Sequence, residues 1–364
     1  MRPTLCEIDL RAISHNVGKL REMVAPTPLC AVVKANGYGH GSVQVARAAL
    51  DAGAGWLGVA LVEEGIELRA AGIEAPILLL SEPPVTSMSS VVEHGLVPSL
   101  YTSAGIAAMA EAAPPAAQLT VHLVVDSGMR RVGVEPIDLS ALIDEISVSD
   151  RLALGAVWTH CPVADEPDNP FTNAQLATFD QLVESLPIGV SHHVANSATA
   201  ITHPHRPAVM VRCGISIYGI DPAAALSGLV QLEPAMRLTS AVSFVKQIGA
   251  GEGVGYGLRW TSATATKIAT VPIGYADGVR RDLGLRGGAV LIGGERHPIR
   301  GVVTMDQLMV DVGESEVSIG DEVVLIGAQG EYEILARDVA ETLDTIPYEV
   351  VCAISERVPR VYTQ

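Results

Sequence analysis

Short apolar runs alternate with stretches of helical spacing over residues 29–213. Eight runs have the length and the Val, Ile and Leu content of buried strands. They cover residues 29–34, 56–60, 76–80, 97–101, 119–126, 154–160, 190–196 and 209–213. Between them, segments such as 42–52, 103–112 and 173–186 carry apolar residues at the spacing of an amphipathic helix. Because this alternation is typical of a parallel sheet, eight units that close on themselves predict a TIM barrel.

The pattern changes after about Leu232. Val, Ile, Thr and Gly dominate the rest of the chain, glycine pairs at 287–288 and 293–294 indicate tight turns, and the next clear helical window is 335–343. These features favour a β-rich second domain. We therefore predict a barrel domain over residues 1–232 and a β-rich domain over residues 233–364, with 221–234 as a connector. The first residues of the chain are candidates to pair with the second domain.

Composition excludes several classes of protein. The chain has 364 residues, of which 48% are hydrophobic, and a net charge of -17 that opposes binding to a phosphate backbone. Apolar runs such as 76–80 are far shorter than the roughly 20 residues of a membrane-spanning helix. Charges at Arg2, Glu7 and Asp9 disfavour a signal peptide. We expect a cytoplasmic protein that binds neither nucleic acid nor a membrane.

Cysteine and histidine patterns predict neither a disulfide framework nor a metal site. The five cysteines are odd in number and contain no C-x-x-C pair, so we interpret them as small buried residues. Four histidines lie close together in the sequence without a fixed carboxylate or thiolate partner, which favours structural or corridor roles over metal binding. They are His192, His193, His203 and His205.

Polar residues stand at the carboxyl ends of the predicted strands, where a TIM barrel places its chemistry. A lone lysine there is most often a solvated strand end. Lys34, however, is accompanied by other polar groups at the predicted strand ends. A buried lysine loses its proton readily and forms a Schiff base with a carbonyl, while a serine hydroxyl and the backbone amides near Gly214 can bind a phosphate. This combination suggests pyridoxal 5′-phosphate (PLP). The other strand-end residues are Asp126 with Arg131, His160, Asn196 with Ser197, and Arg212.

Motifs along nearly the whole chain resemble, in order, those of alanine racemases. The most specific is AVVKANGYGH at 31–40, which is similar to the PLP-lysine signature of that family. The other matching segments are VDSGMRRVG at 125–133, TH at 159–160 with ADEP at 164–167, ANS at 195–197, VRCGISIYG at 211–219, GVGYG at 253–257, IGYADG at 273–278, MDQ at 305–307, YE at 348–349 and RVPR at 357–360.

The resemblance implies an N-terminal (β/α)8 barrel, a C-terminal β domain and a head-to-tail homodimer with shared active sites. Lys34 would carry PLP and act as the base on one face of the cofactor. Tyr256 of the partner subunit would be the base on the other face. Racemisation needs two bases, because a proton that leaves one side of a planar carbanion must return from the opposite side.

The resemblance also assigns roles to the remaining site residues. His160 and Arg212 would form a relay near Tyr256, and Arg212 would face the pyridine nitrogen of PLP. Arg131 would contact the cofactor's phenolic oxygen and the substrate carboxylate, which the amide of Met305 would also bind. Further cofactor contacts would come from Tyr38, Asn196, Ser197, Gly214, Ile215 and Tyr348. A corridor that admits little more than a methyl side chain would be lined by Asp165, Tyr275, Arg281, Ile346 and Tyr348.

Two positions depart from the family pattern, and several alternatives stay open. Many relatives have a carbamylated lysine that braces the arginine matching Arg131, but this chain has Val124 there. Thr304 also stands where a cysteine is frequent. The same site could serve serine, lysine or a broad range of amino acids. A non-catalytic PLP-binding protein and a PLP decarboxylase on the same barrel are the alternatives outside racemisation.

Overall fold

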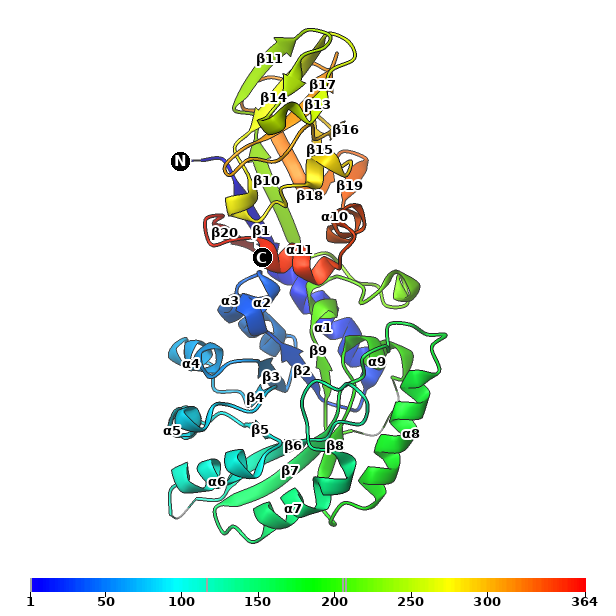
Figure 1. Ribbon diagram of the computed structural model, residues 1–364. Coiled ribbons are helices and arrows are strands. Elements are labelled where there is room, and N and C mark those ends of the chain that lie inside the picture. Colours follow the sequence, from blue (N-terminus) through cyan, green and yellow to red (C-terminus); the bar gives the residue numbers. More distant parts are fainter. Residues whose placement is uncertain (1, 116, 205, 207) are drawn as a thin grey trace. The chain divides into compact units, whose positions relative to one another are not determined.

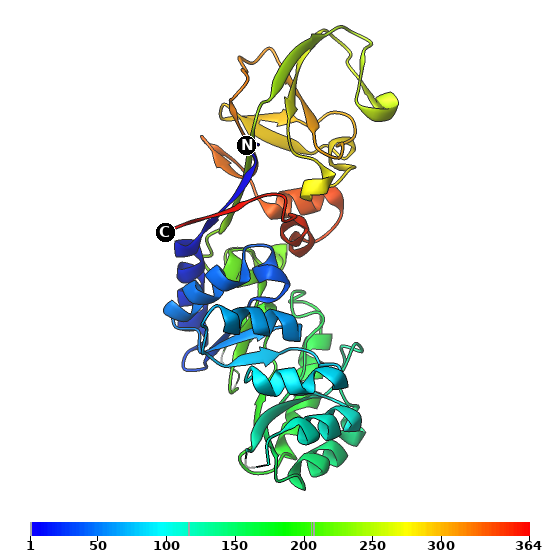
Figure 2. The same ribbon diagram turned by 90° about the vertical axis from the view of Figure 1, so that its left-hand side faces the viewer.

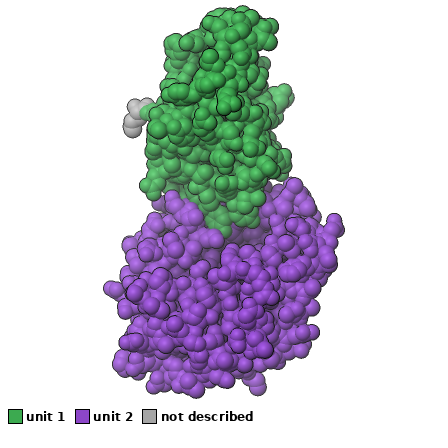
Figure 3. Space-filling model, viewed as in Figure 1, with its two compact units in different colours: residues 1–11, 38–41, 234–364 green, residues 12–37, 42–233 purple. Residues whose placement is uncertain are grey.

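The computed structural model describes residues 2–115, 117–204, 206 and 208–364. Its contacts divide the chain into two compact units (Figure 3). The first, which we call the barrel unit, comprises residues 12–37 and 42–233. The second, the β unit, comprises the described residues up to Arg11, the segment Tyr38–Gly41 and residues 234–364. Each unit is therefore built from more than one stretch of chain.

Eight parallel strands form the barrel unit, as the apolar runs predicted (Figure 1). Two sheets, in the orders β9-β2-β3-β4 and β5-β6-β7-β8, are joined by a parallel bridge between Leu78 and Val97. On the other side, the amide of Val209 donates to the carbonyl of His192 over 2.9 Å, which connects β8 with β9. The strands are β2(Leu29–Val32), β3(Trp56–Val59), β4(Ile77–Leu79), β5(Ser99–Leu100), β6(Leu119–Val124), β7(Leu152–Trp158), β8(Ser191–His193) and β9(Val211–Cys213).

Helices lie around the outside of these strands (Figures 1 and 2). The expected helical windows are confirmed by α3, α6 and α8. The hydroxyl of Thr102 accepts the amide hydrogen of Gly105 over 2.9 Å and so caps α6. The helices of this part are α1(Leu10–Val24), α3(Ser42–Asp51), α4(Val62–Ala70), α5(Met88–Glu93), α6(Ser103–Ala112), α7(Leu139–Ser147), α8(Phe171–Glu184) and α9(Ser197–Thr202).

The β unit is built on a sheet with strand order β16-β15-β18-β10-β1-β20, with β19 paired to β18. Its strand β1(Leu5–Asp9) pairs antiparallel with β10 and parallel with β20, so both ends of the chain enter one sheet. The strands are β10(Met236–Ala241), β11(Phe244–Ile248), β12(Gly253–Val254), β13(Trp260–Thr261), β14(Thr266–Val271), β15(Ala289–Ile292), β16(Glu295–Pro298), β17(Leu308–Gly313), β18(Glu322–Gln329), β19(Tyr332–Ile334) and β20(Arg360–Thr363).

Two helices also belong to the β unit. The window at 335–343 is confirmed by α10(Ala336–Leu343). Helix α11(Pro347–Ala353) was not predicted, because seven residues are too few to show a clear period. Four of the five cysteines are buried, as expected, but Cys352 on this helix is exposed. No helix among the described residues is both long and apolar enough to cross a bilayer.

A substitution at Leu78 tests how much the barrel core contributes to the free energy of unfolding. It is fully buried on β4 and packs with Cys30 and Met210. We expect Leu78→Ala to lower the free energy of unfolding by about 3 kcal/mol, because it removes apolar contacts and leaves a cavity. Urea denaturation followed by circular dichroism measures the change. The control is Leu61→Ala at an exposed position, and equal losses for the two variants would contradict the packing described here.

Candidate active site

The chain turns abruptly at Lys34, directly after β2. Helix α2(Lys34–Tyr38) is left-handed inside, with φ near +50 to +60° at Ala35, Asn36 and Gly37. Tyr38 also has a positive φ, of 51°. This conformation costs roughly 1–2 kcal/mol for each residue that has a Cβ atom, so surrounding contacts must hold it.

Two side chains hold this turn. A carboxylate oxygen of Glu64 accepts the amide hydrogen of Ala35 over 2.6 Å, and its other oxygen accepts that of Ala60 over 2.8 Å. The amide oxygen of the Asn36 side chain accepts the amide hydrogen of Ser42 over 3.0 Å. The strained backbone at Lys34 is therefore fixed from two sides within the barrel unit, at the carboxyl end of its strand.

Arg212 on β9 is a buried cation without a carboxylate. Its residue exposure is 3%, and its guanidinium donates to the carbonyls of Thr159 and Val194 over 2.9 Å each. The guanidinium also lies 4.4 Å from the centre of the Trp158 ring. No acidic side chain among the described residues forms an ion pair with it, and burial lowers its pKa to about 10. The positive charge of Arg212 is therefore available to an anionic or polar group that binds beside it.

A chain of histidines continues from Arg212 into the barrel interior. Because a guanidinium can only donate, Nδ1 of His193 must accept its hydrogen bond. Nε2 of His193 then carries the hydrogen and donates to Nδ1 of His122 over 3.1 Å. Burial, followed by the charge of Arg212, lowers the pKa of His122 to about 4 and that of His193 well below its usual value. Both rings are therefore neutral at pH 7.

His160 follows β7 at the same edge of the barrel. Burial lowers its pKa to about 3, and the charges of Arg212, Arg131 and Lys34 act in the same direction. The structure therefore brings these predicted residues within electrostatic reach of one another. The side-chain nitrogen of Asn196 lies 3.4 Å from Nε2 of His160.

Ser197 is hydrogen-bonded to the turn before η3(Ile215–Tyr218). The Ser197 hydroxyl accepts the amide hydrogen of Gly214 over 2.9 Å, and Ile215 opens the short helix. Ser216 is fully buried, and its hydroxyl has no hydrogen-bond partner among the described residues. Sequence reasoning missed Ser216, since a serine within an apolar run gives no local signal of this kind.

Val124 is buried at the end of β6. A valine side chain carries no amine, so it cannot form the carbamate that a lysine would at this position. Arg131 itself is exposed. Within the described parts of the chain, no hydrogen bond or ion pair holds its guanidinium. Asp165, in the loop after β7, is half-buried.

The other predicted site residues belong to the β unit. Tyr256 stands between Gly255 and Gly257, which both have a positive φ, and it is 72% exposed. Tyr38 and Tyr348 lie near each other, with ring centres 6.1 Å apart. The carbonyl of Arg281 accepts the amide hydrogen of Val303 over 3.0 Å. Large exposed side chains also occur at Tyr275, Met305 and Ile346.

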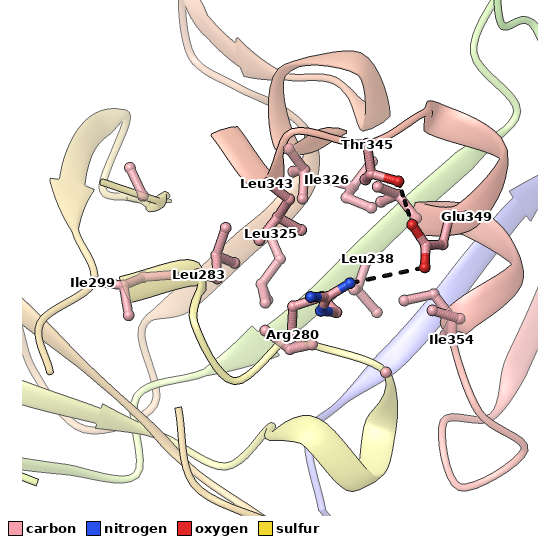
Figure 4. Close-up of a pocket in the computed structure, with 16 residues that line it drawn as sticks. Leu238, Arg280, Leu283, Ile299, Leu325, Ile326, Leu343, Thr345, Glu349 and Ile354 are labelled. Atoms are coloured by element: carbon pink, nitrogen blue, oxygen red, sulfur yellow. Dashed lines mark hydrogen bonds and ion pairs between the residues drawn. The ribbon is translucent and has the colours of Figure 1, made fainter. Parts of the chain in front are cut away.

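A separate pocket in the β unit contains none of the predicted site residues (Figure 4). About 620 Å³ of space, including the part open to solvent, lies between mainly aliphatic side chains such as Leu238, Leu325 and Ile326. Its polar edge is formed by Arg280 and Glu349, whose charged atoms are 3.8 Å apart. This lining offers no pair of groups for acid–base catalysis, so we exclude the pocket as the reaction site.

Metal binding has no support in the part of the chain that the structure describes. No three His, Cys, Asp or Glu side chains there come close enough to hold an ion. His193 instead bonds Arg212 and His122, and His203 bonds Thr202 and Asn173. His205 lies outside the described residues.

Comparisons with known proteins give consistent matches over the full length. Residues 8–222 match the model of the alanine racemase N-terminal domain, and residues 235–362 match that of the C-terminal domain. The alanine racemase of Symbiobacterium thermophilum is 46% identical over 368 residues, covering 100% of this chain and 97% of the relative.

Solved structures extend the comparison. An alanine racemase from E. faecalis is 40% identical, with a TM-score of 0.95 over 100% of this chain and 98% of that chain. A histidine racemase from Leuconostoc mesenteroides subsp. sake is 30% identical, with a TM-score of 0.91 over 100% of this chain and 98% of that chain. The same architecture therefore occurs in racemases named for two different amino acids.

The buried histidines predict how stability depends on pH. Because the folded state lowers the pKa of His122, the unfolded chain binds the proton more readily, and stability is lost as the pH falls from about 6.5 towards 4. We expect this group alone to remove about 3 kcal/mol of the free energy of unfolding between pH 7 and pH 4. Urea denaturation at both pH values should show a smaller loss for His122→Gln than for the unaltered protein. Leu78→Ala is the control, because it should lower stability equally at both values, and an unchanged pH dependence in His122→Gln would contradict the assignment.

Proposed function

The chain belongs to the alanine racemase family, and from this premise we propose that it is a PLP-dependent isomerase that interconverts L-alanine and D-alanine. The observation that carries the proposal is the cluster of Lys34, His160 and Arg212 at one edge of the barrel, in which the buried guanidinium has no carboxylate partner. A site with this charge suits a small anionic cofactor and an amino-acid carboxylate.

The polar groups of the barrel unit fit PLP. The turn at Gly214 and Ile215 leads into η3, where the hydroxyl of Ser216 has no hydrogen-bond partner among the described residues, and Ser197 at the start of α9 accepts the amide hydrogen of Gly214. We infer that this turn, with Tyr38 and Tyr348, holds the phosphate, that Lys34 holds the aldehyde carbon, and that Asn196 contributes to the cofactor pocket. When bound, the cofactor supplies an electron sink for the charge left on the substrate's alpha carbon.

Arg212 controls how strong that electron sink is. A guanidinium donates hydrogen bonds but does not give up its proton, so a ring nitrogen that faces it stays unprotonated. Among the described residues, no carboxylate pairs with this guanidinium. We infer that Arg212 keeps electron withdrawal moderate and so favours rapid return of the proton over side reactions.

Two bases perform the proton transfers. The amine of Lys34 takes or returns the proton on one face, and the phenol of Tyr256 of the partner subunit does so on the other face. Neutral His160, whose pKa is about 3, can accept a hydrogen bond from a phenol without competing for the proton. The high exposure of Tyr256, Tyr275 and Met305 supports a homodimer, because large exposed aromatic and apolar side chains are common on interaction surfaces.

Substrate size separates the candidate functions. We infer that Arg131 and the amide of Met305 bind the carboxylate, and that Asp165, Tyr275, Arg281 and Ile346 line a corridor fitted to a methyl group. Because a protein of the same architecture is named a histidine racemase, a larger substrate stays an alternative for this chain, as do serine, lysine and broad specificity. A non-catalytic PLP-binding role would not need Tyr256. In our proposal the product, D-alanine, serves peptidoglycan synthesis in the cytoplasm.

The first test is racemisation in heavy water. We expect L-alanine to lose its optical rotation and gain deuterium at the alpha carbon, faster than L-serine, L-lysine or L-histidine. Tyr256→Phe should slow racemisation by about 100-fold or more, because one proton transfer loses its base. The variant should still exchange the alpha proton of D-alanine, through Lys34, but not that of L-alanine. Tyr332→Phe is a matched control at another exposed tyrosine, and equal exchange of both enantiomers by Tyr256→Phe would refute the assigned faces.

The second test is subunit complementation. Lys34→Ala and Tyr256→Phe homodimers should each be nearly inactive. If each site takes Lys34 from one copy and Tyr256 from the other, a mixed dimer has one intact site and one doubly altered site. Random mixing should then restore about a quarter of the unaltered activity, since half of the dimers are mixed. Mixtures that stay inactive although exchange of subunits is shown by mass spectrometry would refute the shared site.

A further inference from the structure

Asp277 is a buried acid that sequence reasoning did not single out. Only Asp126 and Asp277 are buried among the described acidic residues, and Asp277 has 0% exposure. It ends the short helix η6(Tyr275–Asp277) in the β unit. Burying a carboxylate is costly unless charged and polar groups compensate, so its surroundings must explain its presence.

Two arginines and one backbone amide surround the carboxylate. Oδ2 accepts from Nη1 of Arg2 over 2.8 Å and from the amide of Gly274 over 2.9 Å. Oδ1 lies 3.4 Å from Nε of Arg357, without a hydrogen-bond partner among the described residues. Arg357 continues to Asp306 over 2.7 Å. Charges therefore alternate along Arg2, Asp277, Arg357 and Asp306, which we call the charge chain.

The charge chain connects the loops that carry Tyr275 and Met305. The amides of Tyr275 and Ala276 donate to the carbonyls of Thr304 and Met305 over 2.9 and 3.1 Å. A Cβ atom on Gly274 would lie 2.3 Å from both carbonyl oxygens, so only glycine permits this approach. Asp277 fixes the first loop, and Asp306, next to Met305, ties the second loop to the same arginine.

The same cluster reaches the segment after α11. The amide of Ser355 donates to the carbonyl of Asp277 over 3.1 Å, and its hydroxyl donates to the carbonyl of Ala276 over 2.8 Å. Helix α11 carries Tyr348 and ends two residues before Ser355. The segment that follows α11 is thus bonded to the same loop as Asp277.

We propose that Asp277 is a positioning residue that sets the substrate-facing arrangement of Tyr275 and Met305 through the charge chain. The inference rests on the proposed function, in which the Met305 amide binds the substrate carboxylate and Tyr275 lines the corridor. Asp277 lies beneath these residues and does not touch the substrate. Loss of its charge leaves Arg2 and Arg357 without their common partner and weakens the link between the two loops, which then depends on their backbone hydrogen bonds.

The test compares Asp277→Asn with the unaltered holoenzyme. The substitution keeps the shape and can still accept the Gly274 amide, but it removes the charge. We expect KM for alanine to rise about tenfold or more, with a smaller change in kcat, because a charge-assisted contact that orders the binding residues is lost. Hydrogen exchange measured by mass spectrometry should rise in the peptides that contain 274–278 and 303–307, and stay unchanged in β18.

Asp311→Asn is the matched control. Asp311, on β17, also joins an arginine, Arg300 at 3.4 Å, and accepts from Thr266 over 2.6 Å, yet it has no contact with the charge chain. This variant should keep the KM of the unaltered enzyme. If Asp277→Asn does not fold, Arg2→Gln and Arg357→Gln, at partly exposed positions, carry the test and should each raise KM and local exchange.

The outcomes distinguish the two proposals. Absence of racemase activity in the unaltered enzyme would overturn the proposed function. An active enzyme whose KM is unchanged by Asp277→Asn, or raised equally by Asp311→Asn, would overturn the positioning role. Faster exchange throughout the β unit would also overturn it, because the role would then be structural support of the whole unit.

Discussion

An arginine buried without a carboxylate is the constraint on which the barrel site depends. The Arg212 guanidinium can only donate, so every neighbour must accept: two backbone carbonyls, the ring of His193 and the face of Trp158. This requirement sets the tautomer of His193 and, one step further, the hydrogen bond received by His122. Burial, and after it the charge of Arg212, lowers the pKa of the nearby histidines and keeps them neutral.

At Lys34, a strained backbone conformation rather than a buried charge shapes the local structure. The apolar strand β2 ends just before the lysine, at the edge of the barrel, and the chain turns directly afterwards through residues in the left-handed conformation. Ala35 and Tyr38 tolerate this conformation because the Glu64 carboxylate and the Asn36 side chain satisfy the amides around the turn. The Lys34 side chain therefore stands at a backbone turn that several hydrogen bonds hold, which favours accurate positioning.

In the β unit, ion pairs rather than a left-handed turn hold the segments that carry predicted site residues. Its sheet contains strands from both ends of the chain, and Arg2, just before the first strand, reaches the buried Asp277. The short loops that carry the exposed residues Tyr275 and Met305 are thereby anchored to an ionic network centred on one buried carboxylate. The apolar pocket beside α11 lies within the same unit but contributes none of these contacts.

Local pattern was sufficient to predict much of this protein. Apolar runs predicted the eight strands and helical periodicity predicted helices such as Ser103–Ala112, because a strand buried on both faces is apolar throughout and a helix buried on one face keeps its period. The strand ends indicated Lys34, His160 and Arg212, and the motifs indicated the family. Tertiary structure decided what periodicity does not encode. His122 and His193 are 71 positions apart yet share a hydrogen bond, and Arg2 and Asp277 are 275 apart yet form an ion pair. Such polar contacts depend on which elements the fold brings together, and a buried serine, histidine or aspartate within an apolar or glycine-rich run carries no local sign of its partner.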